Sequence, residues 1–83
     1  MATIAERTIH IFVFVQIDHE KHVKVEFDKS RVTGAEIKAK AGVPSDYELA
    51  IVHGQRHEAV RDNQEIEIRD GEHFVAVPGG SVS

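Results

Sequence analysis

Hydrophobic and polar residues alternate along two stretches near the start of the chain. Residues 8–17 are rich in β-branched and aromatic side chains, which is typical of a strand. Their alternation separates an aliphatic set from Phe12 and Phe14, which fall on the opposite face. Residues 22–27 alternate in the same way, with Val23, Val25 and Phe27 inward. The two stretches predict an antiparallel hairpin whose first strand turns its aliphatic residues, Ile9, Ile11, Val13, Val15 and Ile17, toward the core.

A short helix is predicted in the middle of the chain. Thr33 and Glu36 match a capping box, in which each side chain accepts a hydrogen bond from the backbone amide of the other residue. Gly42 suits the left-handed conformation that ends a helix. A helix of about two turns is unstable alone, so we expect Ile37 and Ala41 to pack it against the sheet.

The second half of the chain predicts three more strands. Residues 47–53 and 73–77 are apolar enough for full strands, and residues 65–69 alternate as a short one. The Asp70-Gly71 pair is a strong turn signal before the last strand. Residues 56–64 are mostly polar, and they contribute no element to the predicted order.

The predicted order is strand, strand, helix, strand, short strand, strand, with residues 28–32 as a polar connection before the helix. One helix must then cover one face of a mixed sheet of four to five strands, which is the α+β, β-grasp arrangement. We expect a flexible leader (1–7), a β-grasp domain (8–78) and a flexible diglycine tail with a removable extension (79–83). The predicted core includes Ile11, Val13, Val15, Val25, Ile37 and Phe74.

Composition excludes several classes of function. The chain has 83 residues, which suits one domain, and a formal charge of −4 without a basic stripe, so nucleic-acid binding is not expected. The absence of cysteine excludes disulfides, thiolate metal sites and a thiol nucleophile. No signal peptide or membrane-spanning segment is recognisable, so we expect a cytoplasmic protein that does not bind membranes.

Histidines and serines offer no catalytic pattern. His19 and His22 have a three-residue spacing, but they are predicted in a turn, without cysteines or patterned carboxylates beside them. Solvated histidines are therefore expected rather than a metal site. Ser30, Ser45 and Ser81 have no nucleophile elbow and no base at motif spacing. Neither a cofactor nor an enzymatic activity is expected.

Several segments resemble ubiquitin and its bacterial relatives. Residues 43–46, followed by an apolar strand, look like the segment after the ubiquitin helix. The strand at 73–77, which leads to Gly79-Gly80, looks like the last ubiquitin strand and its diglycine. More specifically, residues 33–49 and 70–74 are similar to bacterial proteins of the multi-ubiquitin type. The resemblance implies a ubiquitin-like β-grasp fold for almost the whole chain.

The resemblance also implies a function and a set of partners. Such bacterial proteins are associated with an activating enzyme, a conjugating enzyme and a metallopeptidase that trims or removes the modifier. Systems of this sort are linked to anti-phage defence. The chain would then be a ubiquitin-like modifier joined to target proteins. It departs from the pattern in carrying one domain, where many relatives carry tandem domains, and in placing Pro78 directly before Gly79.

The pair Gly79-Gly80 has a physical rationale as a conjugation terminus. An activating enzyme must adenylate a terminal carboxylate in a narrow channel, and glycine, without a Cβ, lets the backbone enter it. Gly80-Ser81 is then the processing site, where Ser81-Val82-Ser83 is removed. Two alternatives stay open, a sulfur carrier whose C-terminal glycine becomes a thiocarboxylate and a β-grasp binding module without C-terminal chemistry. A flexible end to the domain would also explain the two glycines.

Phe12 and Phe14 form a second candidate site. If the aliphatic set of the first strand is buried, both phenylalanines stand on the open face of the sheet. Large aromatic side chains on such a face often mark a partner surface. An inversion of the two faces, or cover by the N-terminal residues, would also explain them.

Overall fold

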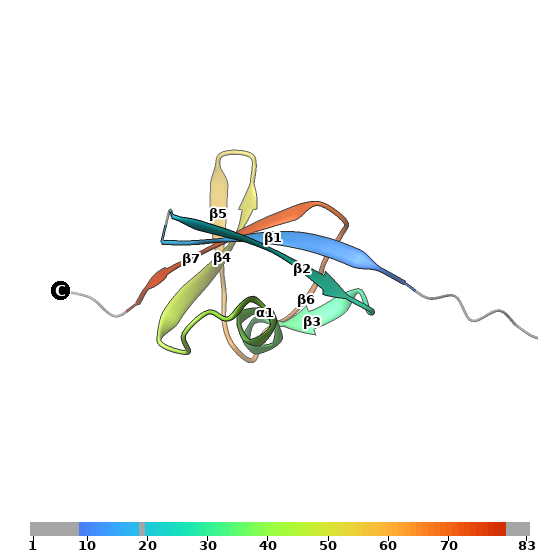
Figure 1. The fold of residues 1–83 in the computed structure, drawn as a ribbon, viewed down its shortest axis with the longest axis horizontal. Coiled ribbons are helices and arrows are strands. Elements are labelled where there is room, and N and C mark those ends of the chain that lie inside the picture. Colours follow the sequence, from blue (N-terminus) through green and yellow to red (C-terminus); the bar gives the residue numbers. More distant parts are fainter. Residues whose placement is uncertain (1–8, 19, 80–83) are drawn as a thin grey trace, which may run out of the picture.

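A five-stranded mixed sheet packed on one helix forms the body of the molecule (Figure 1). The computed structural model describes residues 9–18 and 20–79. The predicted α+β arrangement is confirmed. The sheet is built from β1 (Ile11–Ile17), β2 (Lys21–Phe27), β4 (Tyr47–His53), β5 (Arg56–Val60) and β7 (Glu72–Pro78), in the order β2-β1-β7-β4-β5.

The central strand, β7, runs parallel to its neighbour β1, and the other neighbours in the sheet pair antiparallel. Val13 lies opposite Glu72, and Ile17 lies opposite Ala76. Because β1 and β7 run in the same direction, the start of β1 and the end of β7 lie at opposite ends of the sheet (Figure 1). The described chain therefore enters the sheet at one end and leaves it at the other.

The helix α1 (Gly34–Ala41) begins and ends as predicted. The hydroxyl of Thr33 accepts a hydrogen bond from the amide of Glu36 at 3.2 Å, and the Glu36 carboxylate accepts one from the amide of Thr33 at 2.9 Å. Gly42 ends the helix with a φ of 76°, a conformation that favours glycine. Ile37 is fully buried and Ala41 is buried, so the side chains expected to hold the helix on the sheet do so.

The core confirms the predicted face of the first strand. Val13 and Val15 are fully buried, while the even-numbered positions of β1 are only half-buried. Two positions differ from the prediction. Ile11 is half-buried and packs at the margin of the core, as the first residue of its strand. Ile9 is 45% exposed, because it lies before the start of β1. The remaining predicted core residues are all buried: Val25, Ile37 and Phe74.

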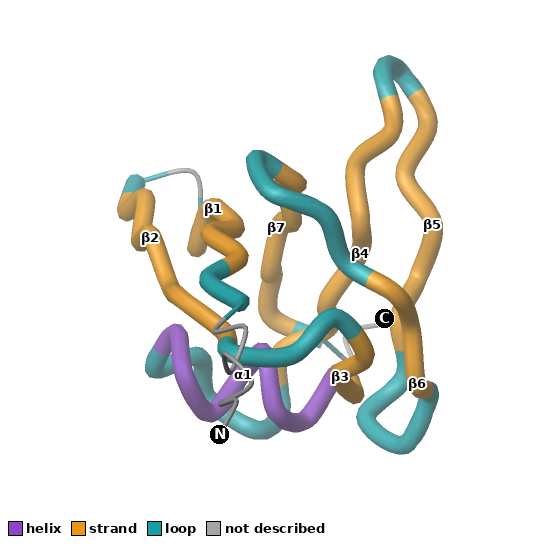
Figure 2. The backbone as a smooth tube through the Cα atoms, turned by 90° about the vertical axis from the view of Figure 1, so that its right-hand side faces the viewer, coloured by secondary structure: helices purple, strands orange, loops and turns teal. Residues whose placement is uncertain are grey.

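Two predicted loops are wrong. The expected polar connection at 28–32 overlaps β3 (Arg31–Thr33), which pairs antiparallel with β6 (Glu65–Glu67) in a second, two-stranded sheet. Val32 is fully buried there, although its neighbours in the sequence are polar. The stretch 56–64 contains β5, whose first four residues are exposed. Those residues lack an apolar face because the β4–β5 hairpin projects away from the helix (Figure 2), so no hydrophobic alternation marked the strand.

Within the described residues, no helix is long and apolar enough to cross a membrane. The expected leader (1–7) lies outside the described residues.

Candidate functional site

The end of β7 lies against the start of β4. Pro78, the last residue of β7, pairs with Tyr47. The amide of the next residue, Gly79, donates a hydrogen bond to the carbonyl oxygen of Asp46 at 3.1 Å. The first glycine of the diglycine pair is therefore held to the body of the domain by its backbone.

Gly79 also lies too close to β4 for a side chain. A Cβ at this position would lie 2.9 Å from the carbonyl oxygen of Asp46 and 2.7 Å from Cγ of Glu48. The Glu48 side chain could turn away, but the Asp46 carbonyl belongs to the backbone. The sequence alone suggests one reason for this glycine, the narrow channel of an activating enzyme. The fold of the chain itself supplies an additional reason, which only the three-dimensional pairing reveals.

Hydrogen bonds hold the turn between β1 and β2 beside the end of β7. The hydroxyl of Tyr47 donates a hydrogen bond to the carboxylate of Asp18 at 2.8 Å. The amide of Asp18 donates to the carbonyl of Ala76 at 3.1 Å, and Asp18 has a positive φ of 57°. The hydrogen bond to Asp18 raises the pKa of the Tyr47 hydroxyl. Three strands are thus tied together where the chain leaves the sheet.

Gly80 and Ser81, the predicted conjugation terminus and processing site, lie outside the described residues. Their roles remain predictions. The described structure ends at Gly79, one residue before the carboxylate that conjugation would use.

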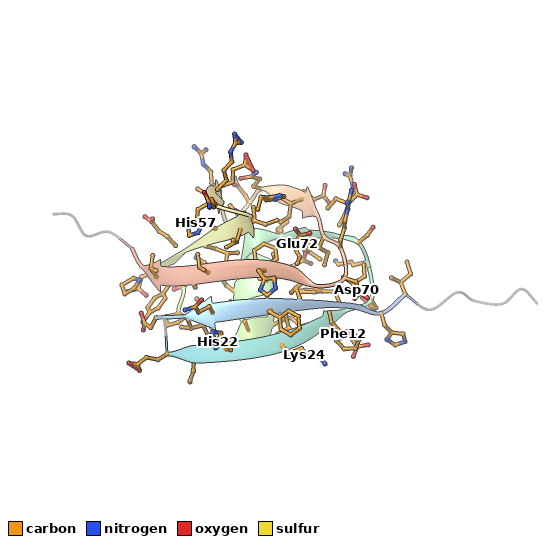
Figure 3. The ribbon with its side chains drawn as sticks, turned by 90° about the horizontal axis from the view of Figure 1, so that it is seen from above. Phe12, His22, Lys24, His57, Asp70 and Glu72 are labelled. Atoms are coloured by element: carbon orange, nitrogen blue, oxygen red, sulfur yellow. The ribbon has the colours of Figure 1, made fainter. Side chains whose placement is uncertain are left out.

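The second candidate site lies on the face of the sheet opposite the helix. Phe12 and Phe14 are both half-buried on this face, while Val13 between them is fully buried on the helix side. The ammonium of Lys24 lies 4.7 Å from the centre of the Phe12 ring, and the two side chains are seen together in Figure 3. The Phe14 ring stacks on His73 with centroids 5.2 Å apart. An inverted strand is therefore excluded, and cover by residues 1–7 lies outside the described chain.

A shallow hollow of about 390 Å³ opens beside Phe14. Two valines and two phenylalanines supply its apolar lining, and imidazoles come from β2, β5 and β7. These histidines were expected in solvent, and the sequence pattern gives no sign that they lie together. His73 lies opposite Phe14 in the pairing of β7 with β1. No group of three or more histidines and carboxylates among the described residues is placed to hold a metal ion. The main lining residues are Phe14, His22, Val52, His57, His73 and Val75.

Most of the chain matches the model of a known protein family. The family model described as Multiubiquitin matches residues 15–79, most of the chain. The matched region runs from within β1 to Gly79, and so it includes the helix, the small sheet, the main sheet except the first part of β1, and the exit beside Asp46. A comparison with curated proteins found no match.

Proposed function

The chain belongs to the Multiubiquitin family, a family of ubiquitin-like domains, and from this premise we propose that it is a protein modifier and not an enzyme. A peptidase trims the chain after Gly80, and an activating enzyme adenylates the new C-terminal carboxylate. A conjugating enzyme then joins the activated modifier to target proteins through Gly80. The pathway is a bacterial ubiquitination-like system that serves anti-phage defence. Domains of this family are typically non-catalytic, which agrees with a substrate of enzymes.

One observation carries the proposal, the position of Gly79 at the end of a central strand. β7 lies between β1 and β4. The hydrogen bond from the Gly79 amide to the Asp46 carbonyl holds the chain in place where it leaves the sheet. The sequence continues with Gly80, so the working carboxylate would stand one residue beyond the folded body. An enzyme that grips the body could then place this carboxylate accurately, and the missing Cβ of Gly80 would let it enter a narrow channel.

The open face of the sheet supports the proposed partners. Phe12 and Phe14 offer aromatic surface that neighbouring side chains only half cover. Aromatic residues are enriched in protein interfaces and often supply much of their affinity. We assign this face to contacts with the activating and conjugating enzymes, whereas a processing metallopeptidase would contact the tail.

Three forms of the chain test the proposal with the cognate activating enzyme and processing peptidase. The chain that ends at Gly80 should be adenylated without the peptidase, whereas the full chain should require trimming first. Gly80→Val in the full chain should resist trimming, because a β-branched side chain stiffens the backbone and fills the channel. Intact mass spectrometry measures the loss of Ser81-Val82-Ser83 and any adduct on Gly80. Equal activation of full and trimmed chains would contradict the proposal.

The same mass measurement distinguishes the protein modifier from a sulfur carrier, the second candidate function. A sulfur carrier would end in a thiocarboxylate at Gly80, and no conjugate to a target protein would form. A binding module without C-terminal chemistry would show neither trimming nor an adduct.

A further inference from the structure

The strand β5 forms an edge of the main sheet that nothing in the described part of the chain covers. β5 is the last strand in the order β2-β1-β7-β4-β5, and its residues from Arg56 to Ala59 are exposed. Figure 2 shows that the β4–β5 hairpin extends away from the helix. The opposite edge is different, because Lys40 from the helix donates a hydrogen bond to the Glu26 carbonyl of β2 at 3.1 Å.

The register of the hairpin determines which backbone groups of β5 point outward. His53 lies opposite Arg56 and closes the hairpin through the two residues Gly54 and Gln55. In a hairpin of this length the closing pair exchanges hydrogen bonds, and bonded pairs then alternate with non-bonded ones. His57 and Ala59 therefore direct their N–H and C=O groups away from β4. A strand edge with such groups exposed is a template for another strand.

We propose that this edge pairs with β5 of a second copy of the chain. In an antiparallel pair, residues whose backbone N–H and C=O groups point outward must face one another. The pairing can therefore have its symmetry axis at His57, with His57 of one copy opposite His57 of the other. Arg56 of each copy then lies opposite Glu58 of the other copy. The dimer therefore contains two such ion pairs, related by its two-fold symmetry. A shift by two residues in register instead places Glu58 opposite Glu58. Opposite charges stabilise facing pairs and like charges destabilise them, so the first register is favoured.

Pairing farther along the strand is limited by the end of β5. A dimer centred on Ala59 would require Arg61 to pair, but β5 ends at Val60, and the amide of Arg61 donates to the side chain of Gln64 at 3.1 Å. The interface centred on His57 is short, so the dimer should be weak and depend on protein concentration and salt.

This pairing has a consequence for the open face. The symmetry axis of two antiparallel edge strands stands perpendicular to the sheet, so the open faces of both copies lie on the same side. The two hollows beside Phe14 and His57 would then form a paired surface. A partner with two contact sites would bind the dimer more tightly than either copy alone.

Sedimentation of the full chain at concentrations up to about 1 mM tests the dimer, since this limit detects weak dissociation constants. Glu58→Arg or Arg56→Glu should each raise the dissociation constant about tenfold, because each creates two like-charge pairs. The double variant with exchanged charges should restore the wild-type value. Glu20→Arg is the matched control, since it makes the same charge change in the turn between β1 and β2. Melting curves verify that each variant folds.

Cysteine cross-linking tests the register in a chain that has no native cysteine. The facing positions at 57 should lie about 5.5 Å apart between Cα atoms, within disulfide range. His57→Cys should therefore form an intermolecular disulfide faster than Glu58→Cys. A wild-type chain that stays monomeric, single charge reversals without effect, a double variant that does not recover, or faster cross-linking of Glu58→Cys would each overturn the proposal. A dimer insensitive to these positions would show that copies meet elsewhere.

Discussion

The amide of Gly79 donates a hydrogen bond to the carbonyl oxygen of Asp46 across 3.1 Å. This bond holds the chain beside β4 for one residue beyond Pro78, where β7 ends. The two glycines of the C-terminal pair therefore differ in their physical roles. Gly79 belongs to the folded body, and the chemistry proposed for the C-terminus depends on Gly80.

Replacing Gly79 tests this division of roles. Gly79→Ala should displace the chain from β4, because the new Cβ would lie 2.9 Å from the backbone carbonyl of Asp46. Loss of the hydrogen bond should cost about 1 kcal/mol, a fall of roughly 4–8 °C in Tm for a domain of this size. Amide hydrogen exchange at position 79, measured by NMR, should become faster.

Glu48→Ala provides the matched control for that substitution. It removes the flexible side chain that a Cβ at position 79 would meet at 2.7 Å, and it leaves the backbone of Asp46 in place. Exchange at Gly79 should stay slow in the single variant. If Gly79→Ala becomes harmless in the Glu48→Ala background, the Glu48 side chain and not the Asp46 carbonyl requires the glycine.

The face assignment of β1 is tested by burying a charge. Val13 is fully buried, so Val13→Asp would place a carboxylate in the core without a partner. A small domain is stable by only about 5 kcal/mol or a little more, so this variant should not fold. Val77→Asp, at a valine of β7 that is 36% exposed, should keep a cooperative thermal transition. A native Tm for Val13→Asp would contradict the assignment.

The sequence predicted those elements whose signals are local. The capping box of Thr33 and Glu36 and the left-handed Gly42 mark the helix within a few residues. The alternation in β1 and β2 needs only one buried face, and that face is the one predicted. Each of these features is complete within its own segment, so pattern and structure agree.

The missed features depend on residues far apart in the sequence. Val32 reads as part of a polar loop, and it is buried because β3 pairs with the distant β6. Lys38 has a charged side chain that is only 6% exposed, with its ammonium 2.8 Å from the carboxylate of the distant Asp62. The steric need for glycine at position 79 arises from Asp46 in the same way. Hydrophobic periodicity along the sequence cannot predict such contacts, because they arise from tertiary packing.

The pKa of Tyr47 gives a pH-dependent prediction. Its hydrogen bond to Asp18 raises the pKa, because it favours the protonated hydroxyl in the folded state. The resulting stability is therefore fully present below the ordinary tyrosine pKa of about 10, and it is lost as the pH rises through the folded-state value. Tyr47 is the only tyrosine and the chain has no tryptophan, so absorbance titration reports this group directly.

Two variants separate the cause of that shift. Asp18→Gly keeps the positive φ of 57° accessible and removes the carboxylate, so the Tyr47 titration should move back toward its ordinary range. Tyr47→Phe should remove the alkaline loss of stability associated with this group, measured by urea unfolding at several pH values. An unchanged titration in Asp18→Gly would show that the hydrogen bond is not the cause.

The final prediction concerns the open face. Phe14 is half-buried and stacks on His73, whereas the core side of the same strand is filled by Val13 and Val15. Phe14→Ala should therefore leave the domain folded and slow the formation of the adenylate with the activating enzyme, because the aromatic contact is lost. The rate of adenylate formation, read with the chain that ends at Gly80, measures this effect without the trimming step.

Phe27→Ala is the matched control, since Phe27 is 3% exposed and faces the helix. Removing this buried ring should lower Tm strongly, at a cost of about 3–5 kcal/mol, while Phe14→Ala should lower it much less. Normal loading of Phe14→Ala would remove Phe14 from the docking surface. Equal loss of fold in both variants would instead show that the ring at position 14 acts as part of the core, and reduced loading would then say nothing about contact with the enzyme.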